Sequence, residues 1–326
     1  MNLEFVSKIY HKFLTNRKTI DFILKIAIAI SLTVFLINYI SLKEIIAAYR
    51  TADINFIIYA VVLSVVNIAF QAIKWKLVLS SSVGEVQYSK AIASYFAGVS
   101  SGLSTPARLG EFIGRALPLK NHNFLDITLM SFVDKIINVL VITFFGAVSA
   151  VLFNRVVNHS HFYLDIPLLI VITTLFAFLV YLFFSKGVLI AIVKKKFKEN
   201  EKITSKISVV EDFLAISFGK KSQIILINIA YYFIILFQFY LLTNAFYGGV
   251  DITQMMFVAS LILFATTVIV PFSFGDIGVR EGAASYLVVL LGLPAATGFN
   301  AALVLFIINV IIPSLFGLIF LIKNKL

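Results

Sequence analysis

Long apolar runs separated by short charged segments dominate the chain. Six runs are close to or above the roughly 20 residues that a helix needs to cross a bilayer: 22–40, 55–80, 124–152, 165–186, 222–247 and 295–322. Inside hydrocarbon the backbone must satisfy its own hydrogen bonds, which an α-helix does and an open strand does not. The pattern therefore predicts an all-α integral membrane protein with six long transmembrane helices.

Two further apolar stretches, at 91–119 and 254–292, are interrupted. Each has an apolar arm, a break rich in Pro, Gly or Ser that carries charges, and a second arm. Irregular backbone at membrane depth is tolerated only where protein covers it or where it lines a wet cavity. Each stretch forms either a re-entrant hairpin or two short spans, so the chain has six spans plus two hairpins, or eight spans.

Composition agrees with a membrane class, since 60% of the residues are hydrophobic and only 13% are charged. The net charge of +11 comes from basic residues between the apolar runs, chiefly in the N-terminal flank, at 186–221 and at the C-terminus. Basic loops stay in the cytoplasm, which places both termini there. The expected partners are therefore anionic membrane phospholipids and not nucleic acid. The chain has no cysteine, and no cofactor or metal site is expected.

One membrane domain accounts for residues 1–326. It divides into repeat 1 at about 20–152 and repeat 2 at about 165–322, with a cytoplasmic connector at 187–221. Apolar spacing within 203–218 predicts either an amphipathic helix on the cytoplasmic leaflet or a solvated basic connector.

The two interrupted stretches share the motif Pro-x3-Gly-acid-x3-Arg. It reads Pro106, Gly110, Glu111 and Arg115 in the first stretch, and Pro271, Gly275, Asp276 and Arg280 in the second, with every match 165 residues apart. Pro ends the incoming helix, and Gly (Gly278 included) lets the backbone turn. If both hairpins re-enter, each half crosses three times, which inverts the second half and puts a transport site near the midplane.

Ionisable side chains at this depth are costly, so a functional site is the default interpretation. The candidate substrate or head-group ligands are Arg108, Glu111, Arg115, Asp134, Asp276, Arg280 and Glu281. The three arginines suit a phosphate, because guanidinium forms paired hydrogen bonds to it. The structural alternative is that Glu111–Arg115 and Asp276–Arg280 are ion pairs that neutralise each other.

Other polar residues within the apolar runs indicate structural roles. Asn67, Gln71, Gln238, Asn300 and Asn309 are expected to form hydrogen bonds between helices. Lys74, Trp75 and Lys76, at the end of the second span, are typical of an interfacial anchor.

Three segments resemble the lysylphosphatidylglycerol synthase transmembrane, or flippase-like, family. They are Lys74-Trp75-Lys76, the run from Ser104 to Glu111 with Arg115, and the run from Gly275 to Ala283, the last being the most specific. Asp276 departs from the family, which commonly has a small residue there, whereas Asp134 falls where the family tends to carry an acid. The resemblance implies a membrane domain that moves aminoacylated phosphatidylglycerol between leaflets. A separate cytoplasmic transferase domain is not expected in this chain, so the resemblance implies a stand-alone flippase-like protein of the inner, or plasma, membrane.

The leading hypothesis is a lipid translocase for a phospholipid or lipid-linked head group. One alternative is a phosphatidylglycerol lysyltransferase-type enzyme or its membrane subunit, although no histidine lies at depth to act as a base. Another is a small-solute transporter with inverted repeats. A non-enzymatic role is favoured, no catalytic residue is assigned, and a homo-oligomer or a separate lipid-modifying enzyme both stay open as protein partners.

Overall fold

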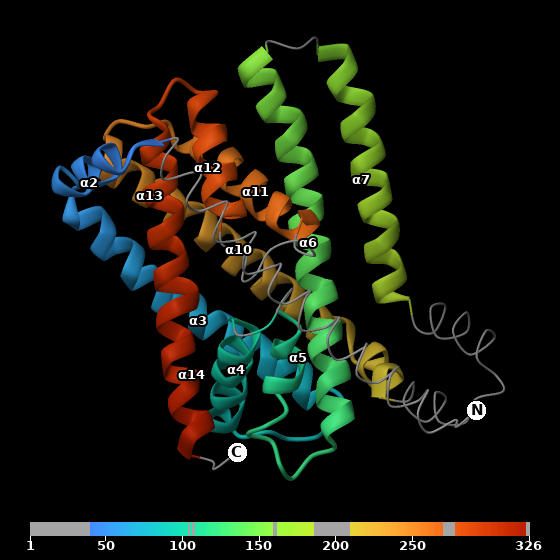
Figure 1. Cartoon of the computed structure of the whole chain (residues 1–326). Coiled ribbons are helices and arrows are strands. Elements are labelled where there is room, and N and C mark those ends of the chain that lie inside the picture. Colours follow the sequence, from blue (N-terminus) through green and yellow to red (C-terminus); the bar gives the residue numbers. More distant parts are fainter. Residues whose placement is uncertain are drawn as a thin grey trace, which may run out of the picture.

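The computed structural model describes residues 40–103, 105, 108–158, 162–185, 209–269 and 278–323, and every regular element in them is a helix (Figure 1). The elements are α2 (Leu42–Arg50), α3 (Ile54–Ser80), α4 (Tyr88–Leu103), α5 (Gly110–Gly114), α6 (Phe124–Asn158), α7 (Phe162–Phe184), α10 (Phe218–Tyr247), α11 (Ile252–Ile269), α12 (Val279–Val289), α13 (Ala295–Phe306), the π-helical η3 (Ile307–Ile311) and α14 (Ile312–Lys323).

Five helical segments among these residues are long and apolar enough to cross a membrane. They are α3, α6, Asp165–Phe184 within α7, α10, and the continuous segment Ala295–Ile322 that combines α13, η3 and α14. They confirm five of the six predicted spans. The predicted span at 22–40, both termini and most of the connector lie outside the described residues, so the predicted orientation stays a prediction.

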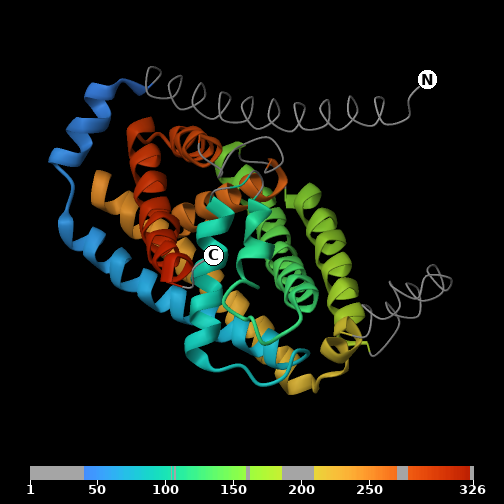
Figure 2. The same ribbon diagram turned by 60° about the horizontal axis from the view of Figure 1, so that its bottom comes forward.

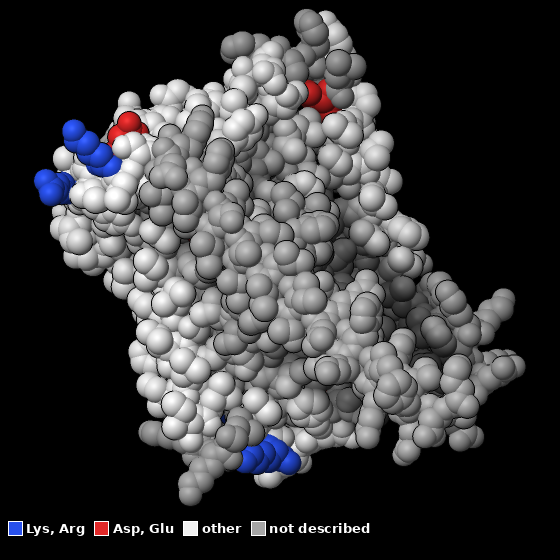
Figure 3. Space-filling view, viewed as in Figure 1, with Lys and Arg blue, Asp and Glu red and all other residues white. Residues whose placement is uncertain are grey.

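Exposed charge is confined to the two ends of the molecule in the view of Figure 3. The visible Lys, Arg, Asp and Glu side chains lie at the top and the bottom, and the white surface between them carries none. A band of this kind suits hydrocarbon, where an exposed charge is costly.

The two interrupted stretches each form a pair of packed helical arms. Helix α4 packs against α5, and α11 packs against α12. Gly110 begins α5, and a Cβ there would lie 2.2 Å from the Ser101 carbonyl oxygen. Gly278 is the N-cap of α12 with φ of 84°, a conformation that favours glycine. The predicted break residues Pro106, Pro271 and Gly275 lie outside the described residues.

Helices α3 and α10 pack against each other in opposite directions (Figures 1 and 2). At the start of α3, the Asp53 N–H donates to the Ala245 carbonyl near the end of α10, at 2.9 Å. Helix α4 packs along α14, and α11 packs along α6. Helix α7 lies beside α6 at the edge of the molecule, where Phe144 and Phe176 stack with ring centroids 3.9 Å apart.

A chain of amide side chains joins three of the long segments. Asn67 of α3 donates to Asn309 of η3 at 3.0 Å, and Asn309 donates to Gln238 of α10 at 3.1 Å. Gln238 donates to the Ala60 carbonyl at 2.8 Å, and Gln71 donates to Asn67 at 3.3 Å. Asn300 similarly donates to the Ile45 carbonyl. The predicted hydrogen bonding between helices is confirmed for Asn67, Gln238, Asn300 and Asn309, whereas Gln71 bonds to Asn67 within α3 itself.

The described part of the predicted amphipathic segment is helical, and its apolar face is buried against the protein. Residues 209–215 are helical, and Val209, Phe213 and Leu214 are buried in the apolar cluster that contains Trp75 and Val78. The predicted amphipathic face therefore packs on the protein at these positions.

Candidate functional site

Lys74 and Asp134 form a buried ion pair between α3 and α6. The Lys74 Nζ lies 2.9 Å from Asp134 Oδ1, and both side chains are 2% exposed. Lys74 also donates to Asn138 of α6 at 2.5 Å and to Asn228 of α10 at 2.8 Å. The prediction that Lys74 and Trp75 anchor the span at the interface is wrong, because Asp134 supplies a counter-charge that lets Lys74 point inward.

Arg115, at the end of α5, lies between two carboxylates. Its Nη1 is 2.9 Å from Asp134 Oδ2, and its Nη2 is 2.5 Å from Glu111 Oε1. Its guanidinium lies over the Trp75 ring at 4.5 Å from the centroid. Trp75 is fixed in turn by a 2.9 Å hydrogen bond from its indole N–H to Ser94. The predicted i,i+4 pair of Glu111 and Arg115 is thus present.

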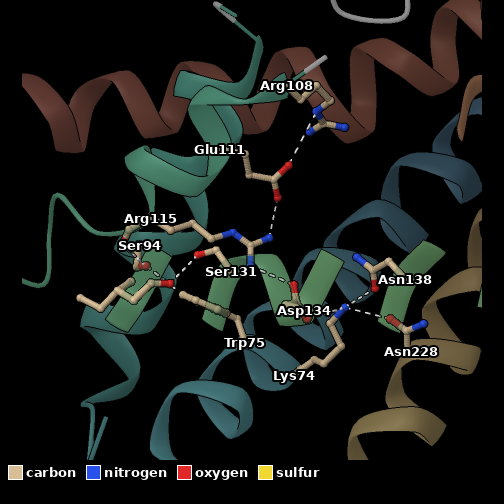
Figure 4. Close-up of polar contacts among 11 residues, drawn as sticks. Lys74, Trp75, Ser94, Arg108, Glu111, Arg115, Ser131, Asp134, Asn138 and Asn228 are labelled. Atoms are coloured by element: carbon tan, nitrogen blue, oxygen red, sulfur yellow. Dashed lines mark hydrogen bonds and ion pairs between the residues drawn. The ribbon is translucent and has the colours of Figure 1, made fainter. Parts of the chain in front are cut away.

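Arg108 continues the row of charges beyond Glu111. Its Nε lies 3.9 Å from Glu111 Oε2. Its φ of 55° is in the left-handed region, which is uncommon for a residue other than glycine and is over-represented at functional sites. Figure 4 shows five side chains of alternating sign that run from Arg108 through Glu111, Arg115 and Asp134 to Lys74. We refer to these five residues as the charge chain.

Small residues of α4 and α5 let these two helices pack closely beside the charge chain. A Cβ on Gly98 would lie 2.4 Å from Arg115 Cγ, and a Cβ on Gly114 would lie 2.6 Å from the Ser101 Cβ. Helix α5 therefore lies against α4 at a distance that a larger side chain would prevent. This close packing holds Arg115 between α4 and Asp134.

The second hairpin has a different arrangement. Arg280 is 9% exposed, and its guanidinium lies 4.5 Å from the centroid of the Phe306 ring. Glu281 is 3% exposed and accepts a 2.7 Å hydrogen bond from the Gly278 N–H, which caps the start of α12. Asp276, the predicted partner of Arg280, lies outside the described residues.

A cavity of about 240 Å³ lies where the two hairpins meet. Four of its lining residues carry a charge: Arg108 and Glu111 from the first hairpin, Arg280 from the second, and Lys135 from α6. The others are tyrosine, amide, threonine and aliphatic side chains with Phe306: Tyr95, Tyr231, Tyr232, Asn67, Gln71, Asn138, Asn309, Thr266, Thr267, Val99, Val139, Ile142, Ile235, Leu263, Leu305, Phe306 and Val310. The volume is below the roughly 300–1,000 Å³ of pockets that enclose drug-sized ligands, so it suits a small polar group.

The cavity lies near the middle of the long helices. Asn67 is the central residue of α3, and Asn138–Ile142, Tyr231–Ile235 and Leu305–Val310 lie near the middle of α6, of α10 and of the α13–α14 segment. One wall is η3, a π-helical turn that precedes Pro313. Pro313 has no N–H for the carbonyl four residues before it, and π turns often occur at functional sites.

The predicted site residues divide into two groups. Arg108, Glu111 and Arg280 line the cavity, whereas Arg115 and Asp134 lie behind its wall in the charge chain and Glu281 caps α12. Ligand binding by any of them stays a prediction. Sequence reasoning missed the inward position of Lys74, which the structure shows buried beside Asp134. No group of three or more His, Asp or Glu among the described residues is arranged to hold a metal ion.

The sequence that forms the two hairpins matches a known protein family. The family model described as lysylphosphatidylglycerol synthase TM region matches residues 22–317, which include both hairpins and the whole charge chain. No curated protein and no solved structure matches the chain.

Proposed function

The chain belongs to the lysylphosphatidylglycerol synthase transmembrane family, and from this premise we propose that it is a lipid translocase of the plasma membrane. In this proposal the head group of a phospholipid or of a lipid-linked sugar passes through the cavity while its acyl chains stay in the bilayer. The five long apolar helices and the family match make the chain a multi-pass membrane protein.

The helix bounds support an inverted repeat. Adding 165 to the bounds of α3, α4 and α6 gives 219–245, 253–268 and 289–323, close to the bounds of α10, α11 and the α13–α14 segment. The packing has the same relation, because α4 packs along α14 as α11 packs along α6. The equivalent helices α3 and α10 run in opposite directions, as an inverted pair must.

The lengths of the hairpin arms favour re-entry over two full spans. Helix α4 has 16 residues and α12 has 11. At 1.5 Å per residue these are about 24 Å and 16 Å long, less than the roughly 30 Å of hydrocarbon that a spanning helix must cross. With both hairpins re-entrant, their breaks lie within the membrane, where they need protein or a wet cavity around them.

The cavity at mid-depth is the observation on which the proposal depends. Arg108, Lys135 and Arg280 line this cavity, and the white surface between the two charged ends in Figure 3 carries no visible charge. Positive groups placed there lower the cost of moving a phosphate through hydrocarbon, and guanidinium suits phosphate in particular. Alternating exposure of one repeat against the other would open the cavity to each leaflet in turn.

A leaflet assay in proteoliposomes tests the proposal. A phospholipid with a fluorescent acyl chain is reconstituted with the purified protein, and a membrane-impermeant quencher measures how fast the inner-leaflet label reaches the outer leaflet. We expect the wild-type protein to accelerate this movement over protein-free liposomes. Val139→Phe, which fills the cavity without changing charge, should abolish the acceleration.

The matched control is Val171→Phe, which makes the same change on the exposed face of α7, where Val171 is 60% exposed. This variant should move lipid as the wild type does. Equal activity in Val139→Phe and Val171→Phe would remove the cavity from the transport path, and no movement by the wild type would refute translocation.

A further inference from the structure

Positive charge prevails in the cavity wall. Three cationic side chains, Arg108, Lys135 and Arg280, line the cavity, against one carboxylate, Glu111, among the described residues. Glu111 is itself paired with Arg115 at 2.5 Å. Its negative charge is therefore already balanced from behind the wall.

The second buried carboxylate, Asp134, does not line the cavity and is already paired with two cations. Asp134 is 2% exposed and is held by Lys74 and Arg115, and unlike its neighbour Lys135 it is not among the residues that line the cavity. The sequence repeat places Asp276 four residues before Arg280. Even if Asp276 is added to the wall, three cations face two carboxylates.

Uncharged hydrogen-bonding groups surround these charges. Tyr95 and Tyr231 line the cavity, and within the described part of the chain neither hydroxyl forms a hydrogen bond. Asn67, Gln71 and Asn309 add amide groups to the same wall. A ligand with hydroxyl groups can exchange hydrogen bonds with such side chains, whereas a quaternary ammonium group has none to offer.

We propose that the cavity accepts an anionic phosphate ester of a small polyol, such as glycerol or a sugar, and discriminates against zwitterionic and cationic head groups. The arginines hold the phosphate and the phenol and amide groups hold the hydroxyls. The inference rests on the proposed function for the source of this ligand, a lipid head group. A soluble polyol phosphate has the same chemistry as this lipid head group, and the test below distinguishes the two sources.

The test compares head groups in the leaflet assay with identical labelled acyl chains. The lipids are phosphatidylglycerol, phosphatidylcholine and lysylphosphatidylglycerol, and a separate arm measures uptake of radiolabelled glycerol phosphate. We expect phosphatidylglycerol to move faster than the other two by about tenfold or more, because a misplaced charge in a desolvated site is strongly rejected.

The outcomes separate the two proposals. Equal or faster movement of phosphatidylcholine or lysylphosphatidylglycerol would overturn the inferred selectivity and leave translocation standing. If no lipid moves faster than in protein-free liposomes, the proposed function fails. Uptake of glycerol phosphate with all lipids stationary would refute a lipid source and would support the inferred ligand chemistry.

A charge variant tests the same selectivity within one lipid pair. Lys135→Gln removes one cation from the wall and should reduce the ratio of phosphatidylglycerol to phosphatidylcholine movement several-fold. Lys43→Gln is the control, since Lys43 is exposed on α2. Trp75 fluorescence checks that both variants are folded. An unchanged ratio in a folded Lys135→Gln protein would contradict the charge-based discrimination.

Discussion

Removal of Asp134 is expected to be the most disruptive single change in the charge chain. Its two oxygens lie 2.9 Å from Lys74 Nζ and 2.9 Å from Arg115 Nη1. Asp134→Asn keeps the shape of the side chain and removes the charge. Arg115 would keep Glu111, but Lys74 would keep no carboxylate partner among the described residues, only the amides of Asn138 and Asn228 and the Tyr231 ring 5.0 Å from its Nζ.

The magnitude follows from burial. Breaking a buried ion pair by removing one partner costs about 3–5 kcal/mol, because the other charge stays buried without compensation. Because the amides around Lys74 still solvate its charge, the loss of stability in Asp134→Asn should lie near the lower end of this range, at about 3 kcal/mol. Lys74→Met should cost less, because Asp134 would keep Arg115.

The double variant shows whether the stability loss comes from the Lys74–Asp134 ion pair itself or from any substitution in this region. In Lys74→Met with Asp134→Asn, no lysine charge is left uncompensated, so the double variant should be no worse than Lys74→Met alone. The coupling between the two sites should be about 2 kcal/mol or more, at the upper part of the usual range for contacting pairs.

The assay uses the protein's single tryptophan. Trp75 is fully buried and lies against Arg115, so its emission reports on this region in particular. Thermal unfolding in detergent is followed by the red shift of Trp75 emission. At about 2 °C per kcal/mol for a large domain, Asp134→Asn should lower the melting temperature by about 6 °C. The control is Glu85→Gln, an exposed acid, which should leave it unchanged.

Two results would refute this reasoning. One is an Asp134→Asn protein that melts at the wild-type temperature, which would mean that the pair contributes nothing. The other is additivity, in which the double variant loses the sum of the two single losses, because independent costs are not those of a paired charge.

Three further predictions concern the packing around the site. Gly98→Ala should displace Arg115 and shift Trp75 emission to the red, whereas Gly219→Ala, where a Cβ meets nothing within 4 Å, should not. Asn309→Leu should lower stability by about 1–2 kcal/mol in thermal unfolding, because it removes two interhelical hydrogen bonds worth roughly 0.6–1 kcal/mol each; an unchanged melting curve would count against the amide chain. Glu281→Leu should destabilise by about 1 kcal/mol through loss of the helix cap, and Glu281→Gln should retain most of that stability; equal losses in both variants would contradict the capping role.

The helices were predictable from the sequence because lipid imposes a simple rule on them. A run of about 20 apolar residues has few alternatives to a helix, and five predicted spans agree with the described helices to within a few residues except at the end of α6, which continues to Asn158. The predicted break residues Gly110 and Gly278 stand at the starts of α5 and α12, whereas Asp276, where the motif predicted the second half-helix to start, lies outside the described residues. The inward turn of Lys74 was not predictable, because its position at a span end is typical of an anchor and its partner Asp134 is 60 residues away.

The roles within the site were predictable only in part. Sequence spacing indicated the Glu111–Arg115 pair, which depends on one turn of helix. It could not indicate that Lys135, and not Asp134, lines the cavity, since that depends on how α6 is rotated against α5 and α10. Sequence spacing also could not show that Glu281 caps α12, because an acidic residue at the start of a helix can act either as a helix cap or as a ligand-binding group.

The most direct test of the account is lipid movement by a protein that lacks both cavity arginines. Arg108→Gln with Arg280→Gln removes the two guanidinium groups that line the cavity and leaves the Lys74–Asp134–Arg115 contacts in place. Arg50→Gln, at the exposed end of α2, is the matched control. We predict that phosphatidylglycerol movement falls to the protein-free rate in the double variant and is unchanged in the control, with native Trp75 emission in both. Wild-type movement in the folded double variant would contradict the central claim.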